Sequence, residues 1–515
     1  MLLRKIVIDG IQIDLVNDGY IKNERSYFSI IVGPNGSGKS RILEAISATG
    51  IIRQYLEFKG RKSADGRKNL RIDRRPIGFL DGVSFKESCL FYENKESNNL
   101  SVRRFNPNYP GVSYDRFACE FTGDEVPSKI ICVTNSIFNK FPSVTNTPFM
   151  EFEYDYSYYQ NLSISEDILE DSKGLVHGSK SRIFSKLILN SFFSGKETFN
   201  KLVYFLNTFG ISGGYKLHLR AGSMLQGVSS KGVYDVSKVR EWYERKGKLK
   251  NQDDRGITKD IIDVLDEVFK NLFTKRVMND YETFDNSHFF PDSYSFQIDI
   301  NNENDSDSDL NKKIKLIAEY GFIYVEKIEF TKNDRDISLD SMSSGEINLF
   351  LLLFKINSVI EDNSIILIDE PELSLHPSWQ NEIVPSLQRA FSLYSGCHFI
   401  ISTHSPHVVA SIPENDSCVT ILNDFPRAFP GHRFSGKSSD FQLFSVLGFV
   451  GAENDYLITQ LILIISKLSE EVPLSQGEQY LLEEAGNILK NESTSSRVKH
   501  LILQAQRLNG VDYHE

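Results

Sequence analysis

Cysteine is scarce in this sequence, and no two cysteines form a C-x-x-C pair. Five cysteines scattered over 515 residues do not make the dense framework of a disulfide-stapled secreted domain, and they lack the spacing of a zinc site. The pattern instead favours reduced thiols in the core of a cytoplasmic protein. The five are Cys89, Cys119, Cys132, Cys397 and Cys418.

Long apolar runs are missing as well. The longest, LFLLLF at 349–354 and LILII at 461–465, are far shorter than the ~18 residues that a membrane helix needs. The opening MLLRKIVIDG has no apolar stretch before a cleavage site, so we expect no signal peptide. We therefore expect a cytoplasmic protein without a membrane partner, whose 40% hydrophobic content is enough for two or three cores.

Positive charge is in deficit. The formal net charge is −11, which argues against non-specific nucleic-acid binding by the bulk of the surface. Any such contact must use a local patch, and residues 53–75 and 238–250 are the two basic candidates. In the second, Trp242 and Tyr243 lie among cations and could stack on bases. Residues 53–75 could instead be a solvated loop. The aromatic side chains of 238–250 could instead pack in the protein's own core.

Two further absences exclude particular classes of protein. Between the two halves of the site described below, the sequence lacks the heptad repeat of a long coiled coil, which excludes a chromosome-scale rod. The helical patterns after residue 425 lack the D-x-D or acidic cluster with which a TOPRIM nuclease binds Mg²⁺. We therefore expect no nuclease site in this chain.

A phosphate-binding loop is the strongest motif present. GPNGSGKS at 33–40 matches G-x-x-x-x-G-K-[ST], with a β-rich apolar run before it and an amphipathic helix after it, for which Gly50 is the expected end. Its glycines let backbone N–H groups wrap phosphates, its lysine reaches the β- and γ-phosphates, and the hydroxyl of Ser40 binds Mg²⁺. The predicted ATP-binding residues are Gly33, Asn35, Gly36, Ser37, Gly38, Lys39, Ser40 and Arg41.

Two later apolar runs supply the second half of the site. SIILIDE at 364–370 predicts a buried parallel strand that ends at Asp369, where a carboxylate would meet Mg²⁺. Glu370 follows and is placed to act as the general base for water. The run at 397–401 precedes His404, which could bond a γ-phosphate or could simply help to cap the helix that Ser405-Pro406 begins.

The stretch SMSSGEINLF at 341–350 predicts a helix that begins with Ser343, Ser344 and Gly345. Free N–H groups at such an end make an anion site, and we expect these three residues to meet the nucleotide. An ordinary capping box between Ser343 and Glu346 explains the same residues, and the two interpretations are compatible.

The order of these motifs resembles the ABC-type ATPase heads of the RecF, SMC and OLD groups. That resemblance implies an α/β fold of mixed and parallel sheets with flanking helices, and a homodimer or higher homo-oligomer. In the dimer each ATP would lie between one subunit's phosphate loop and the other's Ser343–Gly345. His404 would then be the switch histidine, and hydrolysis is expected to be slow.

KIICVTNSIFNKFP at 129–142 resembles, more narrowly, the PtuA family of ATPase subunits from Septu and retron anti-phage systems. On this mapping Asn135 stands where ABC proteins place a glutamine that binds Mg²⁺, although a simple Asn-Ser turn explains it as well. The resemblance implies a separate HNH nuclease partner and, in retrons, a reverse transcriptase with its RNA–DNA product. It covers 1–50, 129–142 and about 320–425 well, and the rest weakly.

The chain therefore divides, as a prediction, into four segments. They are the N-terminal part of the ATPase head (1–150), a mainly helical insertion with an acidic loop (151–320), the C-terminal part of the head (321–425), and a helical region for docking a partner or oligomerising (426–515). The alternative function is a RecF-like DNA-repair ATPase that binds DNA in an ATP-dependent way. A transporter's ATP-binding subunit fits poorly, because the insertion after the phosphate loop is too long.

Overall fold

The computed structural model describes most of the chain in two compact units. The first unit comprises 1–161, 361–388 and 394–515, and the second unit comprises 162–360 and 389–393. The residues described are 2–18, 20, 24–58, 68–71, 85–92, 99–105, 116–121, 127–134, 140–142, 158–162, 189, 196–208, 210–221, 263–265, 267–268, 296–299, 309–319, 322–332, 335–338, 342–423, 426–450, 453–488 and 495–510.

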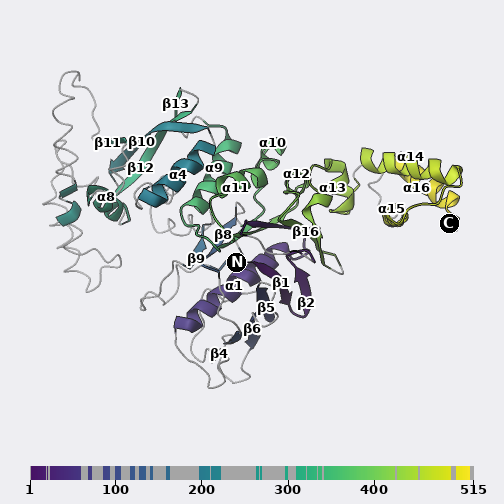
Figure 1. The fold of residues 1–515 in the computed structure, drawn as a ribbon, viewed down its shortest axis with the longest axis horizontal. Coiled ribbons are helices and arrows are strands. Elements are labelled where there is room, and N and C mark those ends of the chain that lie inside the picture. The colour runs from purple at the N-terminus through teal and green to yellow at the C-terminus, as the bar shows by residue number, and fades with distance from the viewer. Residues whose placement is uncertain are drawn as a thin grey trace. The chain divides into compact units, whose positions relative to one another are not determined.

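A seven-stranded sheet forms the centre of the first unit (Figure 1). Neighbouring strands are parallel except the last pair, β16 and β17. Four of its inner strands, β3, β8, β14 and β15, are buried at every residue, which explains their largely apolar sequences. In sheet order the strands are β17 (Arg427–Pro430), β16 (Ser417–Ile421), β3 (Tyr27–Val32), β15 (His398–Thr403), β14 (Ile365–Asp369), β8 (Ile130–Thr134) and β9 (Tyr159–Asn161).

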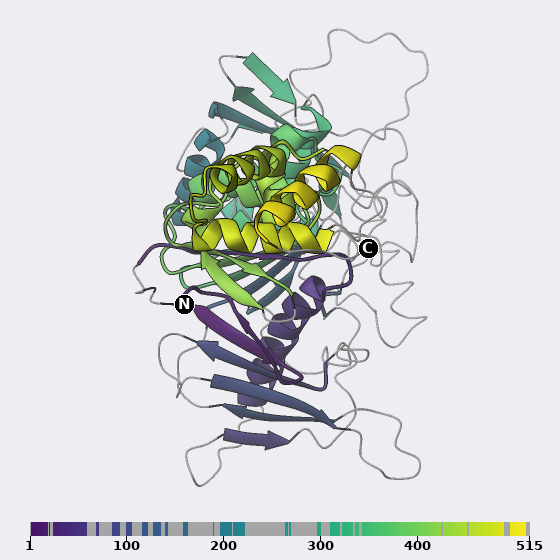
Figure 2. The same ribbon diagram turned by 90° about the vertical axis from the view of Figure 1, so that its right-hand side faces the viewer.

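A six-stranded antiparallel sheet is the second layer of this unit (Figure 2). Helix α1 (Lys39–Phe58) packs against strands of both sheets, and its buried apolar side chains join the two layers into one core. The chain begins with a hairpin, in which β1 pairs with β2. In sheet order the strands are β2 (Ile11–Asp14), β1 (Leu3–Ile8), β5 (Glu87–Tyr92), β6 (Asn99–Phe105), β7 (Arg116–Phe121) and β4 (Lys68–Arg71).

Helix α1 continues beyond Gly50, so the prediction that it ends there is wrong. Gly50 serves a packing purpose instead, because a Cβ at this position would lie 2.1 Å from Cδ1 of Ile130 on β8. The helix can therefore pass close to the parallel sheet only if this residue has no side chain.

The second unit holds an antiparallel sheet and three helices with described bounds. The sheet order is β11 (Phe296–Asp299), β10 (Ile211–Ala221), β12 (Ile323–Lys332) and β13 (Arg335–Ser338). Rings from α4, β12 and α9 pack together: Phe350 and Phe354 are stacked, and Phe205 and Phe330 contact them in tilted geometry. The helices are α4 (Lys196–Thr208), α8 (Asp309–Glu319) and α9 (Ser344–Asn357).

Strands β10 and β11 lie in the segment for which we expected mainly helices. Their sequences alternate apolar and polar residues, as in Tyr215, Leu217 and Leu219 against Lys216 and His218. This alternation has the period of a half-buried strand, and it explains the pairing of β10 with β12. The acidic loop expected at 301–313 ends in the first turn of α8, and 301–308 lie outside the described residues.

The helical patterns predicted after residue 425 are confirmed. The helices pack around a small apolar core of their own, which includes Leu457, Leu461 and Ile464. They are α13 (Ser439–Ser445), α14 (Asp455–Ser469), α15 (Gln476–Ile488) and α16 (Ser496–Leu508). Shorter helices precede them: α10 (Pro377–Gln380), α11 (Ile383–Ala390), α12 (Pro406–Ala410) and the 3-10 turn η4 (Gly431–Arg433).

Within the ranges given above, the structure has no helix with the length and apolar content of a membrane span. Asn135, the basic stretch 238–250 and most of 53–75 lie outside the described residues.

Candidate nucleotide site

The site lies at the carboxyl ends of adjacent parallel strands. In the sheet β15 lies between β3 and β14, and β8 follows on the other side of β14. The register pairs Val32 with Thr403, Ser402 with Asp369, and Asp369 with Thr134, so the strand ends coincide. The residues after each strand therefore meet at one edge, which is where open α/β sheets bind ligands.

The phosphate loop connects β3 to α1. Gly36 and Gly38 have φ angles of 81° and 94°, a conformation that side chains rarely tolerate. A Cβ on Gly33 would lie 2.7 Å from Oγ of Ser37, so the turn closes tightly there. The Ser37 hydroxyl is buried and has no hydrogen-bond partner in the described part of the chain, while Asn35 is exposed. A phosphate oxygen would satisfy the Ser37 hydroxyl and the N–H groups of the first turn of α1.

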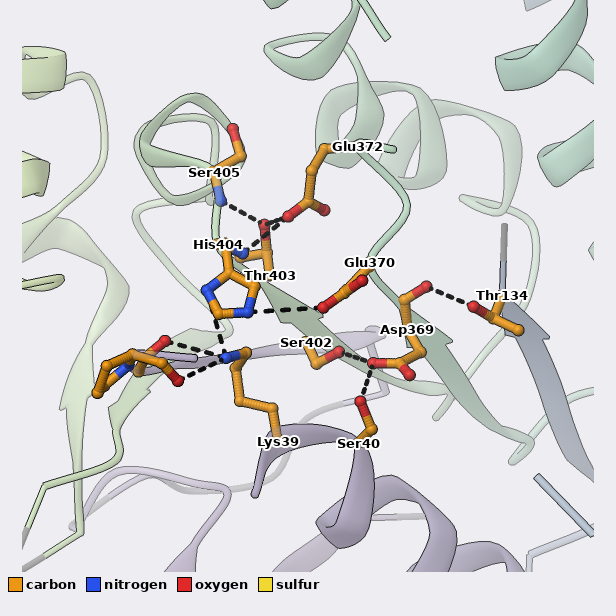
Figure 3. A network of polar contacts seen from close by, with 12 residues as sticks. Lys39, Ser40, Thr134, Asp369, Glu370, Glu372, Ser402, Thr403, His404 and Ser405 are labelled. Atoms are coloured by element: carbon orange, nitrogen blue, oxygen red, sulfur yellow. Dashed lines mark hydrogen bonds and ion pairs between the residues drawn. The ribbon is translucent and has the colours of Figure 1, made fainter. Parts of the chain in front are cut away.

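Lys39 extends from the first residue of α1 across the loop. Its ammonium group donates to the carbonyl oxygens of Gly33, at 2.9 Å, and Pro34, at 3.2 Å. It also lies 3.4 Å from Nδ1 of His404 (Figure 3). Burial lowers the pKa of Lys39, although the carboxylates of Glu370, Asp369 and Glu372 oppose that effect. The lysine is therefore a fixed, largely desolvated cation, which strengthens its attraction for phosphate.

Asp369 is the last residue of β14, and hydrogen bonds from three hydroxyl groups fix its position. Its Oδ1 atom accepts from Ser40 Oγ at 3.2 Å and from Ser402 Oγ, and its carbonyl accepts from Thr134 Oγ1 at 3.1 Å (Figure 3). Two oxygens that bind one octahedral Mg²⁺ at adjacent positions are about 3 Å apart, so Ser40 and Asp369 fit such an ion. Among the described residues, no group of three or more His, Cys, Asp or Glu side chains forms a metal cluster.

Glu370 follows in a strained conformation. Its φ angle is 49°, in the left-handed region that non-glycine residues seldom occupy, and its N–H donates to Ser402 O at 3.0 Å. This turn brings Oε1 to 3.5 Å from Nε2 of His404. Burial, with the neighbouring Asp369 charge, raises the pKa of Glu370, as a general base for water requires. Strain of this kind is typical of functional sites.

His404 lies between Lys39 and Glu370. Burial lowers the pKa of this histidine, and the Lys39 charge lowers it further, so the ring is neutral near pH 7. Because the lysine can only donate, Nδ1 is the acceptor, and the proton of the neutral ring is on Nε2, facing Glu370. His404 does not cap α12. The cap is Ser405, whose Oγ accepts from the N–H groups of His407 and Val408.

The predicted site residues fall in both units, and the structure brings several of those in the first unit together. The phosphate loop, Asp369, Glu370 and His404 converge in the first unit. Arg41, also predicted to bind nucleotide, forms an ion pair with Asp9 at the turn between β1 and β2. The segment Ser343–Gly345 lies in the second unit. There the capping box is present: Ser343 Oγ accepts from the Glu346 N–H at 3.3 Å, and the Glu346 carboxylate accepts from the Ser343 N–H at 3.0 Å.

Four polar residues of this network were not predicted as site residues. Thr134, Ser402 and Thr403 bond Asp369 or its neighbours, and Glu372 bonds the backbone of His404. The signal was present in the sequence, since three of them are hydroxyl residues that end otherwise apolar strands. Only the register of the strands shows which partners they meet.

Comparison with known proteins gives a family model that matches most of the chain. A family model described as "AAA ATPase domain" matches residues 8–409. "Retron Ec83 probable ATPase" of Escherichia coli is 38% identical over 92 residues, and "Retron Vc95 probable ATPase" of Vibrio cholerae is 35% identical over 109 residues. The first match covers 16% of this chain and 16% of the Escherichia coli protein. The second covers 19% of this chain and 20% of the Vibrio cholerae protein, so both lie well under two thirds of the relative's length.

Solved structures give a more distant likeness. An SMC head domain of Pyrococcus furiosus, with an extended coiled coil and the C-terminal domain of ScpA, is 13% identical. The match covers 84% of this chain and 97% of that one, with a TM-score of 0.30. The SMC head domain of Thermotoga maritima is 14% identical, with a TM-score of 0.26 over 84% of this chain and 99% of that one. Likeness at this level carries no inference about the chemistry of this chain.

Proposed function

Because this chain belongs to the AAA ATPase domain family, we propose that it binds ATP and Mg²⁺ at the edge of the seven-stranded sheet and hydrolyses ATP there. One observation carries the proposal. Lys39, Asp369, Glu370 and His404 come from three distant segments and converge at the same strand ends, with the contacts that hydrolysis needs. Such an arrangement is the physical requirement of phosphoryl transfer, in which positioning and electrostatics supply most of the catalysis.

The geometry supports the following proposed roles. The phosphate loop and the Lys39 ammonium hold the β- and γ-phosphates. Ser40 and Asp369 would hold Mg²⁺, which would neutralise phosphate charge there. Glu370 accepts a proton from a water molecule while the water oxygen attacks the γ-phosphorus. The bond to the bridging oxygen breaks, and ADP and inorganic phosphate leave. His404, neutral and with its Nε2–H facing this region, donates toward the Glu370 carboxylate or toward the γ-phosphate.

The second part of the proposal is a dimer closed around ATP. In it, the amino end of α9 from one copy would face the nucleotide on the phosphate loop of another. The Ser343 hydroxyl, exposed and at the positive end of a 14-residue helix, is suited to a γ-phosphate. Gly345 lets the backbone approach closely, and Ser344 supplies the adjoining N–H group.

The third part is a role in anti-phage defence. The chain would act as a PtuA-like subunit that holds and controls a separate HNH nuclease and, in a retron setting, a reverse transcriptase with its RNA–DNA product. Similarity to two retron-associated probable ATPases supports this context. The C-terminal helices, which have their own apolar core, are the proposed docking module.

A pull-down of the tagged chain from its native operon, followed by mass spectrometry and nucleic-acid staining, tests the defence role. A stoichiometric HNH protein, with or without RNA–DNA, is the expected result. A bare ATPase that binds DNA only with ATP would contradict the defence role and favour a repair ATPase of the RecF type. ATP turnover by the purified chain tests the enzymatic part separately.

A further inference from the structure

Glu372 lies two residues beyond the proposed base and connects two parts of the site. Its Oε1 atom accepts from Thr403 Oγ1 at 2.7 Å and from the backbone N–H of His404, also at 2.7 Å (Figure 3). The residues after β14 and those after β15 are therefore joined through one carboxylate oxygen. Charge-assisted bonds of this length are among the stronger ones in proteins.

The other carboxylate oxygen of Glu372 lowers the stability of the fold. Glu372 Oε2 is buried and has no hydrogen-bond partner in the described part of the chain. Burying a carboxylate oxygen without a hydrogen bond is unfavourable in free energy, and an apolar side chain at this position would avoid that penalty. A reason to keep an acidic side chain here is the pair of bonds that Oε1 makes to the His404 segment.

A second connection lies beside the first. Gln380, the last residue of α10, donates from Nε2 to the Leu375 carbonyl at 2.9 Å and accepts from Ser405 Oγ at 2.6 Å. Ser405 in turn caps α12, and its backbone N–H donates to Thr403 Oγ1 at 2.9 Å. The segment 371–380 is thus attached to 403–405 at two points, one on each side of His404.

We propose that Glu372 is a positioning residue, which fixes the backbone of His404 so that the imidazole stays between Lys39 and Glu370. Gln380 supports the same segment from the other side. The inference rests on the proposed ATPase activity, and it adds a connection between the loop after the base and the switch histidine. Displacement of residues 371–376 would be passed to His404 through this carboxylate.

The first test compares Glu372→Ala with Glu372→Gln. Alanine removes the acceptor and should lower kcat by roughly 10- to 100-fold, as expected for a catalytic group displaced by about 1 Å, while the Kd for ATP changes less than about threefold. Glutamine keeps a carbonyl acceptor and should restore most of kcat. Glu414→Ala, at an exposed glutamate outside the site, is the matched control and should turn over like the wild type.

A double-mutant cycle asks whether Glu372 acts through His404. If it does, Glu372→Ala should cost little further kcat in a His404→Ala background, because the group it positions is already gone. Full additivity of the two losses would overturn the proposal. Gln380→Ala should show a smaller loss, with Gln388→Ala, an exposed glutamine on α11, as its control.

Hydrogen exchange gives a readout that does not need turnover. The His404 amide loses its acceptor in Glu372→Ala, so a peptide covering 403–407 should exchange faster, and Glu372→Gln should protect it. An inactive wild-type protein would contradict the proposed function and would leave this exchange test valid. Unchanged exchange and unchanged kcat in Glu372→Ala would contradict the positioning role itself.

Discussion

The Nζ atom of Lys39 lies 3.4 Å from Nδ1 of His404, although the two residues are 365 positions apart in the sequence. The contact joins the start of α1 to the end of β15, and on its far side the imidazole faces Glu370. A cation, a neutral ring and a carboxylate therefore form one row along the strand ends. Each member of the row can be tested by substitution.

Lys39→Ala should abolish ATP binding, because it removes the positive charge that faces the phosphates. Loss of a single charge-assisted contact of this kind costs roughly 2–5 kcal/mol when its partner is left buried. Isothermal titration with ATP and Mg²⁺ measures the effect, and Lys437→Ala, at an exposed lysine before α13, is the control. Tight ATP binding by Lys39→Ala would show that the site has been placed wrongly.

Glu370→Gln should bind ATP normally but lower kcat by about 10²- to 10⁴-fold, because the amide cannot accept a proton from water while the metal ligands stay in place. The trapped ATP should favour the closed dimer in size-exclusion chromatography with light scattering. Glu453→Gln, at an exposed glutamate before α14, controls for the change in charge. Hydrolysis at the native rate would exclude Glu370 as the base.

Ser343→Arg should stop hydrolysis and leave ATP binding by the monomer intact, because the larger side chain would block the approach of a second copy. The chain offers a close control. Ser475 forms the same capping box with Glu478 at the start of α15, so Ser475→Arg loses an equivalent cap, worth about 1 kcal/mol. Equal activity of the two variants would contradict the proposed role in trans.

His398 should make the folded protein sensitive to acid. It is fully buried, its Nδ1 accepts from the Leu3 N–H at 3.2 Å, and its Nε2 lies 2.7 Å from Ser29 Oγ. Burial lowers the pKa of this histidine to about 3 from an ordinary 6.5. Between pH 6.5 and about 3, this histidine is protonated in the unfolded chain and neutral in the folded chain. The free energy of unfolding therefore falls as the pH falls, by at most about 1.4 kcal/mol per pH unit.

The measurement is the midpoint of urea unfolding at several pH values between 7 and 5. His398→Gln should lower the midpoint at pH 7 and should also flatten its dependence on pH. His432→Gln, at an exposed histidine in η4, should leave the wild-type slope unchanged. If His398→Gln keeps that slope, the acid sensitivity comes from other groups.

Gly50→Ala should destabilise the first unit, although alanine in a helix is ordinarily favoured over glycine by roughly 0.5–1 kcal/mol. The new Cβ would lie 2.1 Å from the buried Ile130 side chain, and overpacking of this kind typically costs about 1–3 kcal/mol. Gly477→Ala in α15 meets open space and should be neutral or stabilising. Thermal unfolding of both variants decides, and stabilisation by Gly50→Ala would contradict the packing argument.

Local rules account for what could be predicted from the sequence. The phosphate loop with its strand and helix, the strand ending at Asp369, the capping box of Ser343 and the C-terminal helices each depend on neighbouring residues. Their turns, caps and periodicities are therefore visible in the sequence itself. Where a local pattern served a distant contact, as at Gly50, the same rules led to a wrong helix end.

The residue types and spacings that predict phosphate and metal binding are short-range features, so they could be recognised from the amino-acid sequence alone. Tertiary structure decided how they are used. Pairing of β14 with β15 brought Ser402 to Asp369 and Glu372 to His404, and the left-handed turn at Glu370 directed its carboxylate toward the histidine. Such contacts depend on strand order and register, which arise from the burial of whole strands in a shared core, and no local stretch of sequence specifies them.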